Sequence, residues 1–158
     1  VKVSGFEGEV SYQYKDDLRV LVNCSYQDAR DMNRYKDDGK PSITYNNKLP
    51  NRPWLFSNVE ADYIFRDVLK NGDKLKLSYH YQYVHWFYLT WEAYGSLDGK
   101  SKIPTQHQHN AVVAYSWKNE RYNVSFGCNN LFDKELYDNF MLQKPGRSFF
   151  AKFRIFIN

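Results

Sequence analysis

The sequence contains no long hydrophobic run. None of its 158 residues lies in a stretch that approaches the roughly 18 consecutive apolar residues of a transmembrane helix. Cysteine is scarce as well: Cys24 and Cys128 stand far apart, in neither a metal-binding spacing nor a disulfide framework. Charge of one sign is also lacking, since 22 Lys and Arg against 18 Asp and Glu leave a net charge of +4 without a basic stripe. A transmembrane helix and a cysteine-based metal site are therefore excluded, and nucleic acid is not an expected partner.

Aromatic side chains, in contrast, are abundant. Tyr, Phe and Trp make up 18% of the chain, although its mean hydropathy is −0.73 and the chain is polar on average. A transmembrane β-barrel reconciles these values, because only every second residue of a strand faces lipid while the lumen and loops are polar. Aromatic rings also gather where such a wall meets the two membrane interfaces. The composition is therefore typical of a membrane barrel wall.

Apolar residues recur at every second position, which is the period of a β-strand. The clearest example is residues 74–90, where one face would carry Leu75, Leu77, Tyr79, Tyr81, Tyr83, His85, Phe87 and Leu89. At about 3.3 Å per residue, a single strand of this length would span on the order of 60 Å and project beyond the membrane. Six further segments alternate in the same way: residues 6–14, 18–27, 55–65, 110–117, 121–128 and 149–157.

The connections between these seven segments alternate in length. Three are short (15–17, 66–72 and 118–120) and three are long (28–52, 92–106 and 132–146). Tight periplasmic turns and long extracellular loops produce this asymmetry in outer-membrane barrels. The sequence therefore predicts an all-β fold, an antiparallel transmembrane β-barrel wall of about seven strands.

Seven strands do not make a complete barrel. Bacterial single-chain barrels normally have an even number of strands, and an open sheet edge is not tolerated in lipid. The sequence also opens without Met or a signal peptide, which an exported protein would need. We therefore expect the chain to be the C-terminal part of a larger barrel.

Five short motifs follow one another along the chain. They are DARD (28–31), LPNRP (49–53), IPTQHQHN (103–110), NNLFDKE (129–135) and PGRSFF (145–150). Local backbone preferences also account for these residue types. Asn130 and Asp133 are suited to the end of a strand, and Pro145 with Gly146 is suited to the start of the next strand of the wall. As an ordered set they resemble the last strands of the TonB-dependent receptors of Gram-negative outer membranes. One departure is that Ile157, followed by Asn158, stands where this family usually ends on an aromatic residue.

The resemblance implies both an architecture and a function. Such receptors are barrels of about 22 strands plugged by an N-terminal domain. They bind and import scarce nutrients of the ferric-siderophore, haem or cobalamin type and are not enzymes. Residues 1–158 would be the C-terminal segment of the barrel, with the plug domain and TonB box absent. The implied partners are outer-membrane lipid, the plug and remaining strands, TonB through the plug, and an iron chelate or similar small ligand.

No catalytic set is present, so the candidate sites are binding surfaces. Side chains expected near the outer rim or in loops suit a flat, anionic chelate, because they offer aromatic rings and a guanidinium group. From the alternation of side chains between the two faces of a strand (their parity), the candidates on the inward face near the rim are Trp54, Trp86, Tyr88 and Phe150. The loop candidates are Arg34, Tyr35, Tyr45 and Tyr137. The alternative is that the loop aromatics pack on one another.

Charged side chains expected in the lumen form a second group: Arg19, Glu60, Asp62, Lys76, Lys152 and Arg154. Asp62 should lie roughly opposite Lys76 on the neighbouring strand, where opposite charges stabilise modestly. These groups could hold a plug that must move, since polar contacts exchange with water. Simple solvation of the lumen is the alternative.

The histidines raise a haem or metal hypothesis. His107 and His109 are two residues apart and share a strand face. His80 is expected to face the lumen and His85 the outside, so these two cannot easily share one ion. Solvated imidazoles at the outer end of the strand are the alternative, and neither a metal nor a cofactor is predicted.

Two rival interpretations remain open at this point. One is a complete small outer-membrane barrel that acts as an adhesin or structural protein. The other is a soluble antiparallel β-domain that binds a ligand or acts as an enzyme. The length of the native polypeptide tests the first rival, and dependence on detergent tests the second.

Overall fold

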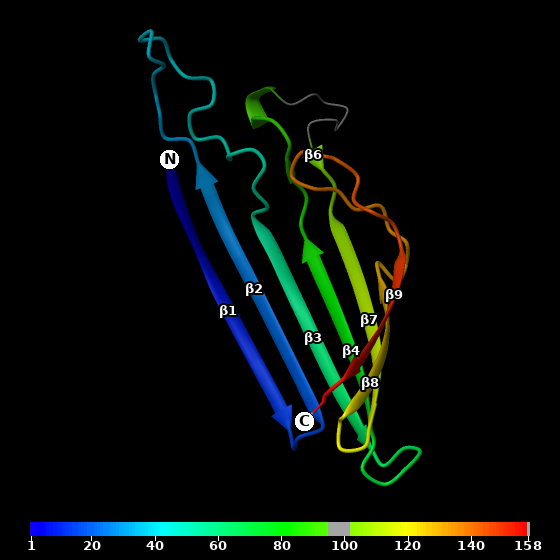
Figure 1. Cartoon of the computed structure of the whole chain (residues 1–158). Helices are drawn as coiled ribbons and strands as arrows, with labels where there is room; N and C mark the ends of the chain where they lie inside the picture. The colour runs from blue at the N-terminus through cyan, green and yellow to red at the C-terminus, as the bar shows by residue number, and fades with distance from the viewer. Residues whose placement is uncertain (95–101, 158) are drawn as a thin grey trace.

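The computed structural model describes residues 1–94 and 102–157, and most of them lie in β-strands (Figure 1). No described helix is long and apolar enough to cross a membrane. The elements in chain order are β1 (Lys2–Tyr14), β2 (Leu18–Arg30), β3 (Leu55–Arg66), β4 (Lys74–Val84), β5 (Phe87–Tyr88), the short 3-10 helix η1 (Glu92–Tyr94), β6 (Lys102–Ile103), β7 (Gln106–Trp117), β8 (Tyr122–Asn129) and β9 (Ser148–Ile155).

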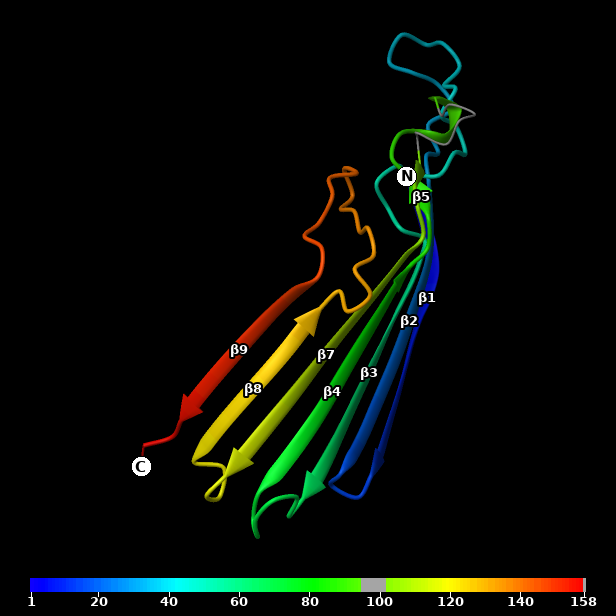
Figure 2. The same ribbon diagram turned by 90° about the vertical axis from the view of Figure 1, so that its right-hand side faces the viewer.

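Seven strands form one antiparallel meander in the order β1-β2-β3-β4-β7-β8-β9, and β5 pairs with β6 in a separate two-stranded sheet. Each large-sheet strand therefore pairs with its neighbour in the sequence, as the alternating segments predicted. The sheet is twisted and curved but does not close, so β1 and β9 are its two edges (Figures 1 and 2). The long connections lie at one end of the sheet and the tight turns at the other (Figure 2).

The prediction of one strand over residues 74–90 was wrong. Strand β4 ends at Val84, which pairs with Phe56 on one side and Gln106 on the other. Beyond this point the His85 backbone N–H still donates to the Leu55 carbonyl of β3 at 2.9 Å, but His85 and Trp86 belong to no strand, and the chain resumes as β5 against β6. Part of the predicted long connection 92–106 is thus strand β6, and its residues 95–101 lie outside the described part, as does Asn158.

The sheet has two chemically different faces, which the register defines. One row across β2, β3, β4 and β7 reads Val22, Val59, Tyr81 and His109, and the adjacent row reads Asn23, Asn58, Gln82 and Gln108. We call the face that carries Tyr81 the outward face and the face that carries Gln82 the inward face. The alternation predicted from the sequence is therefore confirmed along these strands.

Little of the chain is buried. Among the described residues the buried apolar side chains are Ala29, Phe87, Ile103, Cys128 and Leu136. Large apolar side chains on the outward face stay accessible, for example Val10 at 70% and Phe149 at 62%. A soluble sandwich would bury one apolar face against another layer. This single-layered sheet instead has the surface of a wall that needs an apolar environment.

Candidate functional site

A row of uncharged amides crosses the inward face toward the end with the long loops. Asn23, Asn58, Gln82 and Gln108 are direct partners on four successive strands. Asn58 Nδ2 donates to Asn23 Oδ1 at 2.9 Å, and Gln82 Nε2 donates to Asn58 Oδ1 at 3.3 Å. We call this set the amide row. It offers both donors and acceptors without a net charge.

A second row, nearer the tight turns, brings a carboxylate and an imidazole together. Glu60 faces His80, which faces Asn110 on β7. Asn110 Nδ2 lies 3.3 Å from His80 Nδ1, and Asn110 Oδ1 accepts from the Asn130 backbone N–H at 2.9 Å. A hollow of about 280 Å³ lies beside this row, lined in part by Glu60, Asp62 and Val112.

The predicted pair of Asp62 and Lys76 is present, but it is diagonal. Asp62 stands directly across from Ser78, whose hydroxyl donates to it at 2.6 Å, and Lys76 Nζ lies 3.1 Å from the other carboxylate oxygen. Arg19 is the direct partner of Asp62 on β2. The structure therefore gathers Arg19, Glu60, Asp62 and Lys76 on neighbouring strands of the inward face.

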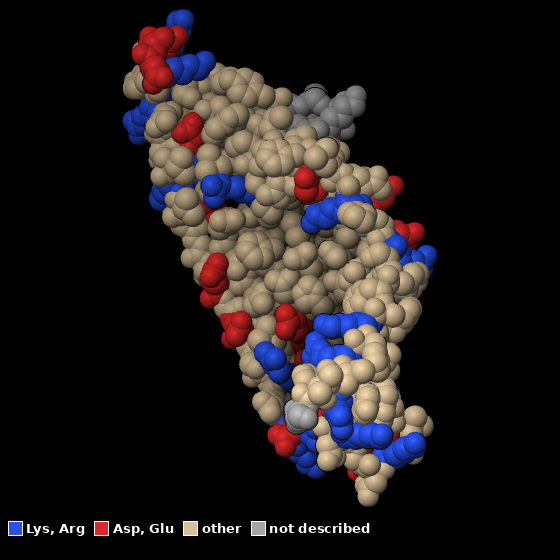
Figure 3. Space-filling model, viewed as in Figure 1, with Lys and Arg blue, Asp and Glu red and all other residues tan. Residues whose placement is uncertain are grey.

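Lys152 and Arg154 share the inward face but not this cluster. They lie on β9 across from Ser125 and Asn123, and two strands separate β9 from β4. Basic side chains gather at the lower right of the face shown in Figure 3. Lys152 and Arg154 therefore lie apart from the cluster around Asp62.

Phe150 faces inward, as parity predicted, and lies over Gly127 of β8. A Cβ atom at position 127 would come within 2.2 Å of the Phe150 ring, so only glycine leaves room for it. The ring is 41% exposed and remains available from the inward side. A hollow of about 250 Å³ is lined by Gln108 of β7 and by residues of the loop after β8, among them Asn130 and Lys144.

Trp54 and Trp86 do not keep the inward position that parity predicted. The Trp54 ring packs edge-on to His85, with centroids 4.4 Å apart, and Trp86 packs against both of these rings. His85 is bonded to the hydroxyl of outward-facing Tyr83 at 2.6 Å. The two indoles therefore pack with outward-facing His85, because both lie outside the paired strands, Trp54 before β3 and Trp86 after β4.

Tyr88 also lies beyond the end of β4, in strand β5. Its ring lies 5.4 Å from that of Trp86, and its hydroxyl donates to Glu92 Oε1 at 3.0 Å. The intervening Phe87 is 1% exposed. Tyr88 thus lies in the separate β5–β6 pair, so the alternation of β4 does not assign it to the inward face.

Two of the loop candidates, Arg34 and Tyr45, contact each other. The Arg34 guanidinium lies over the Tyr45 ring at 5.3 Å and donates to its hydroxyl at 3.2 Å. Tyr35 is 66% exposed. In the same loop, hydrogen bonds from the Asn33 backbone N–H and the Thr44 hydroxyl hold the pKa of Asp31 below its usual value. This carboxylate therefore fixes the loop that presents Arg34.

Tyr137 belongs to the loop after β8. Its hydroxyl donates to Glu135 Oε2 at 2.9 Å, and this bond raises the pKa of the phenol. Its backbone N–H donates to the Gln106 side chain at 2.7 Å. The loop root is thus tied to the first residue of β7, while the Tyr137 ring lies at the loop surface.

The histidines separate as their parity predicted. His80 is inward, whereas His85, His107 and His109 are outward. On the outward face each imidazole Nδ1 lies 2.6–2.8 Å from a tyrosine hydroxyl: Tyr79 with His109, Tyr81 with His107, and Tyr83 with His85. We call these three pairs the tyrosine–histidine column. Within the described ranges, no group of three or more His, Cys, Asp or Glu side chains could hold a metal ion.

Two lysines that sequence reasoning missed lie over indole rings. Lys48 Nζ is 4.1 Å from the centroid of Trp54, and Lys102 Nζ is 4.7 Å from that of Trp86. Both distances are within the range of a cation–π interaction. We call them the two lysine–indole pairs. No local sequence signal could have found them, because the loop path sets the contact of Lys48 and the pairing of β6 with β5 sets that of Lys102.

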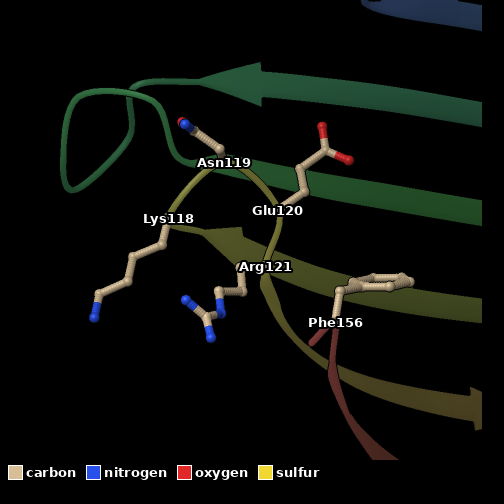
Figure 4. Close-up of a pocket in the computed structure, with 5 residues that line it drawn as sticks. All are labelled: Lys118, Asn119, Glu120, Arg121 and Phe156. Atoms are coloured by element: carbon tan, nitrogen blue, oxygen red, sulfur yellow. The ribbon is translucent and has the colours of Figure 1, made fainter. Parts of the chain in front are cut away.

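A further hollow lies at the opposite end of the sheet. It has a volume of about 470 Å³ and is lined by Lys118, Asn119, Glu120, Arg121 and Phe156 at the β7–β8 turn (Figure 4). The Phe156 backbone N–H donates to the Arg121 carbonyl at 2.9 Å and holds the end of the chain there. This hollow is remote from the long loops and shares no residue with the predicted ligand set.

Comparison with known proteins identifies the family. A family model described as "TonB dependent receptor-like, beta-barrel" matches residues 1–131. No curated protein matches the chain significantly. Among solved structures, the fold is similar to that of BauA, the ferric preacinetobactin receptor from Acinetobacter baumannii, with a TM-score of 0.71 and 17% identity. That match covers 94% of this chain and 21% of the BauA chain.

The chain belongs to the TonB-dependent receptor-like β-barrel family. The resemblance drawn from the motifs is thereby confirmed, and so is the antiparallel barrel-wall fold. The family consists of outer-membrane transporters rather than enzymes. The chain spans about a fifth of the solved receptor, and at 17% identity that likeness shows the fold alone.

Proposed function

We propose that this chain forms the C-terminal part of the barrel of a Gram-negative outer-membrane receptor. The receptor would import a scarce nutrient of the ferric-siderophore, haem or cobalamin type, with energy delivered by TonB to a plug domain outside residues 1–158. The match of the family model to residues 1–131 carries this proposal. The seven-stranded meander supports it, because its open edges at β1 and β9 require further strands in a membrane.

The apolar outward face supports lipid as a partner. Residues such as Val113 and Phe126 are 44% and 55% exposed in the isolated sheet. At about 25 cal/mol per Å² of apolar surface removed from water, covering such a face with lipid is strongly favourable. A soluble domain would instead leave this face in water, at risk of aggregation.

The inward face supports a ligand path next to a plug. The amide row and Phe150 offer hydrogen-bonding groups and an aromatic ring near the loop end, and Arg34 adds a cation in the longest described loop. These groups suit a planar chelate with carbonyl or hydroxyl edges. The inward charges Arg19, Glu60 and Asp62, with Lys76, would contact the plug through bonds that water can replace.

Nutrient uptake by the complete receptor tests this function. A strain that lacks the gene would be complemented with the full-length gene and supplied with radiolabelled ferric siderophores, haem or cobalamin, with and without TonB. TonB-dependent uptake of one nutrient class is the expected result. Uptake that does not depend on TonB, or no difference between the deletion and complemented strains for any class, would contradict it.

A matched pair of loop variants tests the ligand surface. Arg34→Ala should lower uptake several-fold, because it removes the cation that stacks on Tyr45. Lys36→Ala removes an exposed positive charge two residues away in the same loop and should leave uptake unchanged. Equal uptake by the two variants would remove Arg34 from the ligand surface.

A further inference from the structure

The three long connections meet at one residue, Asn51. Its backbone N–H, in the connection between β2 and β3, donates to the Tyr88 carbonyl of β5 at 2.7 Å. With its side-chain amide oriented so that the nitrogen faces the nearby carbonyl groups, Nδ2 donates to those of Leu89 and Asn139 at 2.8 Å each. Leu89 follows β5, and Asn139 lies in the connection between β8 and β9. Asn51 therefore joins three segments that are far apart in the sequence.

The residue type at position 51 fits this junction. The φ angle of Asn51 is 57°, a left-handed conformation that Gly, Asn and Asp adopt more readily than other residues. A simple turn at this position could use any of the three. Two carbonyl groups face the side chain, however, and the amide of Asn supplies two N–H donors, whereas Gly supplies none and an ionised Asp only acceptors.

The junction reaches across the sheet. Strands β4 and β7 stand between β3, which follows Asn51, and β8, which precedes Asn139. Three strand spacings of about 4.8 Å place β3 and β8 on the order of 14 Å apart. The connection after β8 therefore crosses the ends of β7 and β4 to reach Asn51.

Side-chain amides hold this connection to the inward face along its course. Gln106 and Asn110 share the inward face of β7 with the amide row. Asn110 Oδ1 accepts from the Asn130 backbone N–H at 2.9 Å, and Gln106 Oε1 accepts from the Tyr137 backbone N–H at 2.7 Å. Asn51 holds the same connection nearer its tip. The connection is thus a strap over the loop end of the inward face, fixed by amides at its root and by Asn51 at its far side.

We propose that Asn51 is a positioning residue that holds the three long connections together as one unit before a nutrient binds. The inference rests on the proposed function, because it places this unit at the entrance of the nutrient path. Connections that are already joined lose less conformational entropy when a ligand binds, so they bind it more tightly than independent loops would. Asn51 acts through the connections that it joins and needs no contact with the nutrient.

Hydrogen–deuterium exchange of the purified full-length receptor in detergent tests the junction without a ligand. Asn51→Asp keeps the size and the left-handed conformation but turns a carboxylate toward two carbonyl groups. It should speed amide exchange about tenfold in residues 87–90 and in residues 137–142, both remote from position 51 in the sequence. Exchange that is unchanged, or faster only in residues 49–53 as for a local turn residue, would overturn the proposal.

A matched control makes the same substitution at another left-handed Asn of the same connection. The φ angle of Asn46 is 63°, and its backbone N–H donates to the Asp31 carbonyl within that connection. Asn46→Asp should leave exchange in residues 87–90 and 137–142 at the wild-type rate. An equal acceleration by Asn46→Asp would overturn the proposal, because any disturbance of the loop would then have the same effect.

A second variant separates the lost hydrogen bonds from the added charge. Asn51→Gly removes the amide, adds no charge and still permits the left-handed conformation. It should also speed exchange in residues 87–90 and 137–142. Wild-type rates in Asn51→Gly, in a receptor with the native heat-modifiable mobility on a gel, would assign the effect of Asn51→Asp to its charge and overturn the proposal.

Uptake separates the role of Asn51 from the receptor function itself. The variants would be supplied with whichever radiolabelled ferric siderophore, haem or cobalamin the wild-type receptor imports. Both Asn51 variants should raise the concentration for half-maximal uptake about tenfold and leave the maximal rate near that of the wild type. An unchanged half-maximal concentration despite faster exchange would overturn the positioning role. No uptake of any of these nutrients by the wild type would instead reject the proposed function, whereas the exchange rates would still decide whether Asn51 joins the connections.

Discussion

Tyr81 and Gln82 are neighbours in β4 but meet different surroundings. Tyr81 stands between Val59 and His109 on the outward face, and Gln82 stands between Asn58 and Gln108 on the inward face. A charge on a lipid-facing barrel residue costs about 2–4 kcal/mol at the membrane midplane and less toward the interfaces. A charge among solvated amides has no comparable cost.

Arginine at these two positions should therefore have opposite effects. Tyr81→Arg should reduce the amount of heat-modifiable receptor in the outer membrane, whereas Gln82→Arg should leave that amount near the wild-type level. Fractionation followed by gel electrophoresis of unheated samples measures this. Equal assembly of both variants would contradict the assignment of the faces.

Gly127 and Phe150 form a second test at the residue scale. Gly127→Ala should destabilise the barrel by about 1–3 kcal/mol, because the new methyl group overlaps the Phe150 ring. In the double variant with Phe150→Ala the overlap disappears, so the two changes should not be additive. Denaturant unfolding of the four proteins gives the coupling energy, and simple additivity would show that the ring does not occupy this place.

The β3–β4 connection shows how one side chain organises an element. Asp73 is 2% exposed and accepts from the Val68, Leu69 and Lys70 backbone N–H groups and from the Tyr115 hydroxyl. Burial alone would raise the pKa of Asp73, but these hydrogen bonds outweigh it and the pKa is lowered. The ionised carboxylate therefore stabilises both the turn and its contact with β7.

The sign of this pKa shift predicts a pH dependence. A carboxyl group whose pKa is lower in the folded state contributes full stability above its unfolded pKa of about 3.9, and this contribution is lost as the pH falls through the folded value. Thermal unfolding between pH 7 and pH 3 should show a smaller loss of Tm on acidification for Asp73→Asn than for the wild type. Asp133→Asn, a change of a more exposed carboxylate at the other end, provides the comparison.

The loop after β8 has a fixed root and an exposed tip. Asn130 bonds the backbone of Lys134 through both atoms of its amide, and Leu136 is 3% exposed. Phe140 and Leu142 at the tip are 68% and 66% exposed. The root therefore belongs to the wall, whereas the tip is free to contact a ligand.

Deletion of the tip should separate these roles. Replacing residues 139–142 with a short Gly-Ser link should lower nutrient uptake and leave assembly in the outer membrane unchanged. The comparison is Leu136→Ala, which removes a buried contact and should lower stability by about 2–5 kcal/mol. Loss of assembly on deletion of the tip would make the loop structural.

The elements also show how far sequence reasoning extends. Strict alternation predicted the seven strands and the inward position of Phe150, because a period of two fixes the face along any strand held in register by a neighbour, including the edge strand β9. It does not extend to Trp54 and Trp86, because these residues lie just outside the ends of β3 and β4, and the local pattern does not show where those strands end. The lysine–indole pairs depend on the loop path and on the pairing of β6 with β5, and could not be predicted either.

At the scale of the whole molecule, the sheet is a wall with two faces, two ends and two open edges. The outward face is apolar toward the turns and bears imidazoles and indoles toward the loops. The inward face carries the amide row toward the loops and charges toward the turns. This polarity along and across the sheet is what a membrane barrel needs, and a soluble layer would have to bury one of the faces.

The central claim is that these residues form part of the wall of a larger outer-membrane receptor. The most direct measurement is the mass and location of the native polypeptide, detected in fractionated cells with an antibody to residues 129–135. A band several times heavier than 18.9 kDa in the outer-membrane fraction is the predicted result. A band near 18.9 kDa would contradict the claim, because it would leave a soluble β-domain if found in the soluble fraction and a small independent barrel if found in the membrane.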